Sequence, residues 1–430
     1  MMRPGCHCLT GLPLVFVIAC GSSARPSDGG PPGETTGGDD SGGDASANDA
    51  SASLPETGGA DSGGPMSASD ATTSSSRDAS MPVDAGLPTR PDSGDTGPAD
   101  GSTDATKDAA SRDAASDAPP SEVDGGTIAS PSSFHCVNWA DQRDNFVNGL
   151  LQVSGLDSTT DTYATVQAKA NAILSGFETQ LGANAIRIPI NEPTVSGAWW
   201  AAYKGLIDAA VAKGMKVIVA YWAWHNGKPD TTAAYDSMWQ VVVDEYTSNN
   251  LVFFDIHNEP FGFSTTDWMN FAAAWVASFP NVPRSRIIVA GSGYDQNVPP
   301  VGADARLNGC LLSLHDYTFF FSTTMTTQGW QSTVSTGLGG DTARAIVTEW
   351  GAPMTTGVAY DGVGAGTNDQ AYMAGIPNEL RTLGVGSCYW PGLRIADAWS
   401  MTTMSGAASS PSLSVNNTSG LARVHWAWGL

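Results

Sequence analysis

The aromatic residues of this 430-residue chain are confined almost entirely to its C-terminal part. Residues 21–130 contain no Phe, Trp or Tyr, and apart from Phe16 every aromatic residue lies at or after Phe134. Because aromatic side chains dominate packed cores, residues 21–130 lack the material for one. The sequence therefore predicts one globular domain, residues 131–430, although length alone favours two or three domains at roughly 150 residues each.

Residues 21–130 consist mainly of Gly, Ser, Asp, Ala, Thr and Pro. They hold 20 acidic and 5 basic residues, so they carry −15 of the chain's net charge of −23. Such a segment buries too little apolar surface to offset the conformational entropy lost on folding. We expect a disordered acidic linker with an end-to-end distance of about 60 Å as a flexible coil. Both a spacer that holds the domain away from a membrane and unselected filler fit this composition.

The first 20 residues have the layout of an export signal. Arg3 precedes an apolar run from Leu9 to Ala19, which is too short for a membrane-spanning helix of about 20 apolar residues. The run ends in Val-Ile-Ala-Cys at Cys20 and resembles a bacterial lipoprotein signal peptide. This resemblance implies cleavage before Cys20, acylation of that cysteine, and a membrane anchor at the bacterial cell surface or outer membrane. An ordinary secretory signal, which would give a secreted protein, is the alternative.

The predicted domain is only weakly charged. Residues 131–430 hold 37 charged residues and a net charge of −9, a charged fraction below the roughly 25% of typical soluble proteins. The acidic balance argues against nucleic acid as a partner, because a basic face is the electrostatic footprint of nucleic-acid binding. An aromatic-rich domain with few charges suits a neutral, hydroxyl-covered ligand such as a glycan. We expect it to be a monomer.

Short apolar runs alternate with longer helical segments from Phe134 onward. Eight runs have the character of strands: 134–138, 185–189, 216–222, 252–255, 286–290, 311–314, 345–348 and 386–390. Amphipathic segments predict helices at 163–181, 199–213, 235–248, 265–279 and 369–383. Apolar strands with helical crossovers indicate a parallel sheet covered on both faces, and eight such units predict an α/β fold, a (β/α)8 TIM barrel.

An open doubly wound sheet is the rival fold. No Gly-rich phosphate-binding turn follows the first predicted strand, which argues against it. The unit after the fifth strand is the hardest to recognise, because 293–308 has the composition of a loop.

Three cysteines lie in the predicted domain, Cys136, Cys310 and Cys388. At most one disulfide can form among them, and no CxxC or His-rich spacing indicates a metal site. The first and last strands of a closed barrel are neighbours, so Cys136 and Cys388 are the favoured pair.

Functional residues of such barrels cluster where strands end and enter the following loops. Nine residues of this sequence lie at or just past predicted strand ends: Asn138, Arg187, His225, Asn258, Glu259, His315, Tyr317, Glu349 and Trp390. Two of them are carboxylates, Glu259 after the fourth strand and Glu349 after the seventh. Barrel closure places these two strand ends on opposite walls of one cleft, as hydrolysis of a glycosidic bond requires.

These residues resemble the catalytic set of glycoside hydrolase family 5, the cellulase family. Asn258-Glu259-Pro260 is similar to the strand-four motif whose Glu is the general acid/base, and Thr348-Glu349-Trp350-Gly351 to the strand-seven segment whose Glu is the nucleophile. The other similar positions are Arg187 on strand two, His225 after strand three, His315 and Tyr317 on strand six, and Trp390 on strand eight. His225 departs from the pattern, because it lies further past its strand than usual.

The resemblance implies a retaining glycosidase that acts on a β-linked polysaccharide or oligosaccharide without a cofactor or metal. By elementary electrostatics, Arg187 beside Glu349 should lower its pKa and keep it ionised, whereas the pKa of Glu259 should be raised. Tyr317 is expected to orient Glu349, Asn258 to bond the sugar 2-hydroxyl and His315 to bond Glu259. His257 and Glu192, near these motifs, are expected to be supporting or surface groups.

Two alternatives stay open. One is another family-5 specificity, such as mannan, xyloglucan, galactan or a furanoside, with exo rather than endo action. The other is a glycan-binding surface lipoprotein without turnover, although the presence of both carboxylates counts against it. Five further tryptophans fit either sugar stacking or core packing: Trp199, Trp200, Trp224, Trp330 and Trp350.

Overall fold

The computed structural model describes residues 130–143, 146–224, 226–362 and 366–430. The predicted signal peptide, nearly all of the predicted linker and His225 therefore lie outside the described residues. Within the described part, no helix combines the length and the apolar character needed to cross a membrane.

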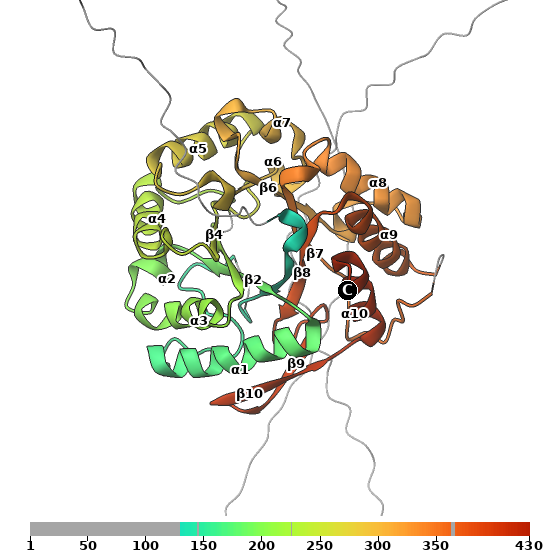
Figure 1. Cartoon of the computed structure of the whole chain (residues 1–430), viewed down its shortest axis with the longest axis horizontal. Helices are drawn as coiled ribbons and strands as arrows, with labels where there is room; N and C mark the ends of the chain where they lie inside the picture. Colours follow the sequence, from blue (N-terminus) through green and yellow to red (C-terminus); the bar gives the residue numbers. More distant parts are fainter. Residues whose placement is uncertain (1–129, 144–145, 225, 363–365) are drawn as a thin grey trace, which may run out of the picture. The chain divides into compact units, whose positions relative to one another are not determined.

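Eight parallel strands close into a barrel in sequence order, with β1 paired to both β2 and β8 (Figure 1). This confirms the predicted (β/α)8 barrel and excludes the open sheet. The strands are β1 (His135–Trp139), β2 (Ala185–Ile190), β3 (Lys216–Tyr221), β4 (Val252–Asp255), β5 (Ile287–Ala290), β6 (Leu311–Asp316), β7 (Ala345–Trp350) and β8 (Gly386–Leu393).

Helices surround the barrel (Figure 1). The longer ones are α1 (Tyr163–Leu181), α3 (Trp200–Ala212), α4 (Thr232–Tyr246), α5 (Thr265–Ser278), α8 (Thr327–Leu338), α9 (Asn368–Leu383) and α10 (Thr418–Trp428). Local sequence sets the ends of α1: Thr162 and Thr165 form a capping box, and Gly182 ends the helix in the left-handed region at φ 68°. The five predicted helices are therefore confirmed within a few residues.

Several elements were not recognised from the sequence. The segment between β5 and β6 forms two single-turn helices, α6 (Ser292–Asp295) and α7 (Pro299–Gly302), and α2 (Glu192–Ser196) follows β2. Helix α8 has many Thr, Ser and Gly residues, which have weak helix propensity, so tertiary packing decides its conformation. Short 3₁₀ turns occupy Pro131–Ser133, Arg284–Arg286, Ala305–Leu307, Thr318–Phe320 and Thr342–Arg344.

An antiparallel hairpin, β9 (Thr402–Ala407) and β10 (Ser410–Val415), follows β8 and packs against α1. Gly176 of α1 allows this close approach, since a Cβ there would lie 2.8 Å from the Leu413 side chain. A hairpin with exposed polar residues on one face carries a weaker sequence signal than the barrel strands.

The lower barrel interior is filled by one buried residue from each strand together with Phe134. These are Cys136, Ala185, Ile218, Phe253, Ile288, Leu311, Ile346 and Cys388. Cys136 and Cys388, which are register partners on β1 and β8, form a disulfide. The predicted pairing is confirmed, and Cys310 is a free buried thiol.

Removing this disulfide with the double variant C136A/C388A is expected to lower the free energy of unfolding by about 2–5 kcal/mol. The bond joins residues 252 positions apart, so its loss frees a long loop in the unfolded chain. Urea unfolding followed by fluorescence measures the change. C310A, which removes a buried cysteine without a disulfide, is the matched control, and equal losses in the two proteins would contradict the prediction.

Candidate active site

The predicted site residues that the structure describes lie together at the carboxyl ends of the barrel strands. Asn138 is on β1, Arg187 on β2, His315 on β6, Glu349 on β7 and Trp390 on β8. Asn258 and Glu259 follow β4, and Tyr317 follows β6. Except for Trp390, all of these residues are buried. The strand ends therefore bring eight of the nine predicted residues to one site.

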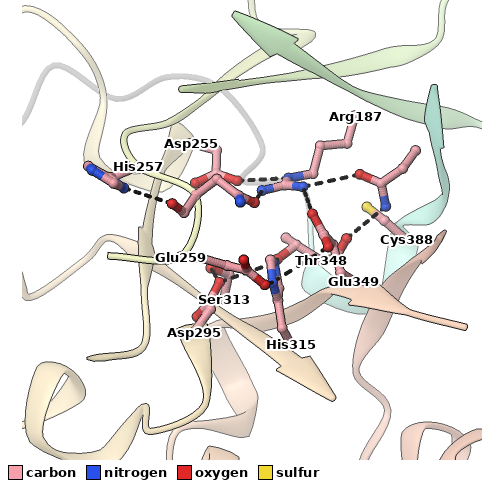
Figure 2. A network of polar contacts seen from close by, with 12 residues as sticks. Arg187, Asp255, His257, Glu259, Asp295, Ser313, His315, Thr348, Glu349 and Cys388 are labelled. Carbon is pink, nitrogen blue, oxygen red and sulfur yellow. Dashed lines mark hydrogen bonds and ion pairs between the residues drawn. The ribbon is translucent and has the colours of Figure 1, made fainter. Parts of the chain in front are cut away.

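Arg187 is the centre of the site (Figure 2). Its Nε donates to Asp255 Oδ2 at 2.8 Å, and its Nη1 donates to Glu349 Oε1 at 2.5 Å and to Asn138 Oδ1 at 3.1 Å. Its Nη2 donates to Asn258 Oδ1 at 2.6 Å. Asn138 is in turn held by its own Nδ2, which donates to the Thr348 carbonyl at 2.9 Å. One buried cation is therefore shared by two carboxylates, and its orientation is set by the hydrogen bonds that it also donates to Asn138 and Asn258.

Glu349 makes both of the contacts predicted for it. Arg187 holds Oε1, and the Tyr317 hydroxyl donates to Oε2 at 2.9 Å. Burial nevertheless raises the pKa of Glu349 to about 7, while Arg187 and Tyr317 oppose that rise and the nearby Asp255 carboxylate adds to it. Arg187 lowers the pKa of Glu349 as predicted, but complete burial outweighs this effect, so the net pKa is raised and the expectation of a low pKa is wrong.

Glu259 contacts His315, whose Nδ1 lies 3.0 Å from Glu259 Oε1. Glu259 is 8% exposed and adopts φ 48°, a left-handed conformation that costs a residue other than glycine on the order of 1–3 kcal/mol. Burial, aided by the Arg187 charge, lowers the pKa of His315 well below its usual range, so the imidazole is neutral. His315 Nδ1 also lies 3.6 Å from Glu349 Oε2, which places the ring beside both carboxyl groups.

The two carboxyl groups lie close together. Glu259, His315 and Glu349 each place one nitrogen or carboxylate oxygen that could bind a metal within 4.8 Å of the other two. Among the described residues, this is the one group of His, Cys, Asp or Glu side chains close enough together to hold a metal ion. The same side chains already bond Arg187, Tyr317 and one another. Their contacts therefore fit a pair of reacting carboxyl groups without requiring an ion.

Aromatic rings lie beside the site in two groups. Trp390 stacks on Trp222 with ring centroids 5.6 Å apart, and the Arg187 guanidinium lies 5.8 Å from the Trp222 ring. On another side, Tyr317 stacks on Phe319 at 4.7 Å, and Trp399 contacts both rings. Flat apolar faces of this kind suit the faces of sugar rings.

The sequence left two roles open for the five further tryptophans, sugar stacking and core packing. Trp199, Trp200, Trp330 and Trp350 are buried in the main core, so they pack rather than face a ligand. Trp224 is partly exposed and lines a small cavity of about 30 Å³ beside Glu192.

Sequence reasoning missed Asp255 and Asp295. Asp255 ends β4, is fully buried, and uses one oxygen to bind Arg187 while its Oδ1 lacks a hydrogen-bond partner. Its sequence position could have indicated this role, because Asp255 ends the apolar strand Val-Phe-Phe-Asp and a buried carboxylate needs a partner of opposite charge. Asp295 lies on the unrecognised α6, and its position follows only from the fold.

His257 is a buried supporting group, which is one of the two expectations, and it does not lie on the surface. It is fully buried, its Nδ1 lies 2.8 Å from the Asn258 carbonyl, and burial lowers its pKa to about 4. Tyr221, Phe263 and Trp268 surround its ring, so it is a core residue beneath the site. Glu192 accepts a hydrogen bond from Tyr221 at 2.9 Å.

A closed (β/α)8 barrel with two buried glutamates at its carboxyl end provides the pair of carboxyl groups that glycosyl hydrolases use. The family model for cellulase, glycosyl hydrolase family 5, matches residues 149–391. The chain belongs to this family.

Solved structures share the fold at low sequence identity. The catalytic domain of the major endoglucanase from Xanthomonas campestris pv. campestris is 17% identical with a TM-score of 0.51, covering 69% of this chain and 95% of that one. Cel5A (EG2) from Hypocrea jecorina (Trichoderma reesei) is 18% identical with a TM-score of 0.50, covering 68% and 97%. The endocellulase from Pyrococcus horikoshii, solved with cellotetraose, is 14% identical with a TM-score of 0.50, covering 69% and 92%. No curated protein matches the sequence.

Proposed function

We propose that this chain is a retaining β-glycoside hydrolase that cleaves a β-linked glucan by double displacement. The observation that carries the proposal is the approach of Glu259 and Glu349 to within 4.8 Å between their nearest ligand atoms. Retaining enzymes hold the two carboxyl groups about 5–5.5 Å apart, whereas inverting enzymes need about 6.5–9.5 Å to admit a water. The endoglucanases that share its fold, one of them bound to cellotetraose, support a glucan substrate.

In this mechanism Glu349 attacks the anomeric carbon while Glu259 protonates the departing glycosidic oxygen. The glycosyl ester that forms carries no negative charge on Glu349, so Glu259 loses a repulsive neighbour and accepts a proton from the attacking water. Arg187 and Tyr317 hold Glu349 in position for attack. Asn258 Nδ2 is buried without a hydrogen-bond partner, which suits donation to the sugar 2-hydroxyl. Trp390 supplies a stacking face, and a role for His225 stays a prediction.

A panel of β-glucans, mannans, xyloglucan and galactans, tested with the full chain, checks the substrate class. Product stereochemistry followed by NMR checks the mechanism. We expect release of a β-anomer from a β-glucan, and an inverted product would overturn the retaining scheme. Turnover of mannan or galactan alone would favour the other family-5 specificities, and binding without turnover would favour the glycan-binding lipoprotein.

The location of the enzyme is a further part of the proposal. Residues 1–20 act as a lipoprotein signal, residues 21–130 as a spacer, and residues 131–430 as a monomeric catalytic domain. Acylation at Cys20 would anchor the chain by burying acyl CH₂ groups, at about 0.8 kcal/mol each. Cys20→Ala is expected to move the protein from the membrane fraction to the soluble fraction, and a variant that still pellets with membranes would contradict the anchor.

Asp255→Asn is expected to move the acidic limb of the pH profile of kcat/KM to lower pH by about one unit. The nucleophile must be ionised, so with a pKa of about 7 for Glu349 the activity falls as pH drops through this value. The Asp255 charge contributes to that raised pKa, so its removal lowers the pKa and extends activity to lower pH.

The matched control is Asp316→Asn. Asp316 is also buried, but it accepts a hydrogen bond from Thr333 and does not contact Arg187. Equal shifts of the acidic limb in both variants would show that Asp255 does not act through the Arg187–Glu349 pair.

A further inference from the structure

A chain of polar contacts continues from Glu259 through His315 to a third carboxyl group, that of Asp295 (Figure 2). His315 Nδ1 lies 3.0 Å from Glu259 Oε1, and on the opposite side of the ring Nε2 lies 3.3 Å from Asp295 Oδ2 and 3.1 Å from Thr348 Oγ1. Asp295 and His315 are at most 1% exposed. The three residues come from the β4 loop, β6 and α6, so only the closed barrel brings them together.

The contacts of Nδ1 determine which ring nitrogen carries the hydrogen. Nδ1 faces two carboxyl groups, Glu259 at 3.0 Å and Glu349 at 3.6 Å. A lone pair at that position would repel an ionised carboxylate, or would draw the Glu259 proton toward the ring and away from the glycosidic oxygen. A hydrogen on Nδ1 donates to Glu259 Oε1, and the other oxygen of the carboxyl then carries the transferred proton.

Nε2 of a neutral ring with its hydrogen on Nδ1 is an acceptor. An ionised Asp295 would place a negative oxygen against that lone pair, whereas a protonated Asp295 donates to it. Two other groups donate to Asp295, the Gly291 amide to Oδ1 at 2.5 Å and the Ser313 hydroxyl to Oδ2 at 2.6 Å, and both lower its pKa. Complete burial outweighs these two hydrogen bonds and raises the pKa of Asp295 well above its usual range, which favours the protonated form.

Backbone conformation supports a functional rather than an incidental contact. Among the described residues other than glycine, three have a positive φ, and two of these are Glu259 at 48° and Asp295 at 58°. Such conformations persist where the surrounding structure imposes them, and they concentrate at functional sites. Both ends of the contact chain are therefore held in strained positions on either side of His315.

We propose that Asp295 is a positioning residue that, as a neutral carboxylic acid, donates to His315 Nε2 and so keeps the His315 hydrogen on Nδ1, directed at Glu259. The role of Glu259 as general acid and base is that of the proposed function, on which this inference rests. Asp295 does not touch the reacting atoms and acts through the tautomer of His315. The titratable or charged groups that face this chain from the packed elements are Arg187, Asp255, Tyr317 and Glu349.

The first test compares Asp295→Asn with Asp295→Leu. The Asn amide still donates to Nε2, so this variant should keep kcat/KM within about threefold and leave the basic limb of its pH profile in place. Leu removes the donor and frees the ring to present a lone pair to Glu259. In that variant we expect about a tenfold loss on substrates with poor leaving groups, a much smaller loss on activated aryl glycosides, and a basic limb moved to higher pH. The control is Asp316→Asn, which should change none of these quantities.

The second test is the ¹⁵N NMR spectrum of histidine-labelled full chain, with the His315 signals assigned by their loss in His315→Gln. The wild type and Asp295→Asn should show a neutral ring protonated at Nδ1, and Asp295→Leu should shift toward the other tautomer. An imidazolium in the wild type near pH 7, or Asp295→Asn as impaired as Asp295→Leu, would overturn the proposal, because either requires an ionised Asp295. The spectrum needs no turnover, so a protein inactive on every glycan would refute the proposed function without deciding this test.

Discussion

Replacing Glu349 by Ala is expected to lower kcat by about 10⁴- to 10⁶-fold, the range seen when an enzyme loses its nucleophile. The variant leaves Arg187 and Tyr317 in place but removes the oxygen that forms the glycosyl ester. Arg187 keeps its contacts with Asp255 and Asn258, so the variant should remain folded. Hydrolysis of an activated aryl glucoside measures the loss.

A small external anion should partly restore this variant. Azide or formate can occupy the space left by the carboxylate and attack the anomeric carbon from the same face, giving a product of inverted configuration. NMR of the product distinguishes this reaction from contamination by wild-type enzyme, which would give retention.

The matched control for Glu349→Ala is Glu379→Ala. Glu379 lies on α9 and bonds Gln331 and Ser335 of α8, outside the barrel. Its loss should leave kcat unchanged. Wild-type turnover in Glu349→Ala, or retained configuration in the rescued product, would refute the assignment of the nucleophile.

Replacing Glu259 by Gln should reduce kcat/KM by about 10²- to 10⁴-fold for glycosides with poor leaving groups. Gln preserves the size of the side chain and an oxygen that accepts from His315 Nδ1, but it cannot transfer a proton. Activated aryl glycosides need little protonation, so their kcat/KM should change much less. Their kcat should still fall, because the base that activates water in the second step is lost.

Azide provides the discriminating measurement for Glu259→Gln. It needs no general base, so it should restore kcat for activated substrates and give a glycosyl azide of retained configuration. Retention here and inversion in Glu349→Ala would separate the roles of the two glutamates. Equal losses of kcat/KM for poor and good leaving groups would show that Glu259 is not the acid.

The strand ends were the most informative part of the sequence. Apolar runs separated by helical segments predicted eight strands, and the residues near or just past the ends of those strands include both glutamates, Arg187 and His315. This succeeds because a parallel barrel delivers all of its carboxyl ends to one face, so position along a strand already implies position in the site. The Cys136–Cys388 pair followed from the same topology, since closure makes the first and last strands neighbours.

Features that depend on packing could not be predicted in this way. Helix α8 and the β9–β10 hairpin have weak local propensities and form because they pack against neighbouring elements. Asp295 belongs to a short helix with no periodic signal, and its importance lies in a 3.3 Å contact with a residue 20 positions away in the chain. The net pKa of Glu349 could not be predicted from the sequence either, because it depends on how far burial outweighs the charge of Arg187, which Glu349 shares with Asp255.

The sequence by itself predicted a barrel within residues 131–430 and indicated which two glutamates lie at the carboxyl end of its strands. These conclusions rest on hydrophobic periodicity and residue order, which are local properties of the chain. Only the tertiary structure decided that Asp255 and Glu349 both bind Arg187, and that the net pKa of Glu349 is raised by burial. It also placed Asp295 in contact with Nε2 of His315, on the side of the ring away from Glu259. Hydrogen bonds and desolvation depend on distances of a few ångströms between residues remote in sequence, and those distances exist only once the barrel has closed.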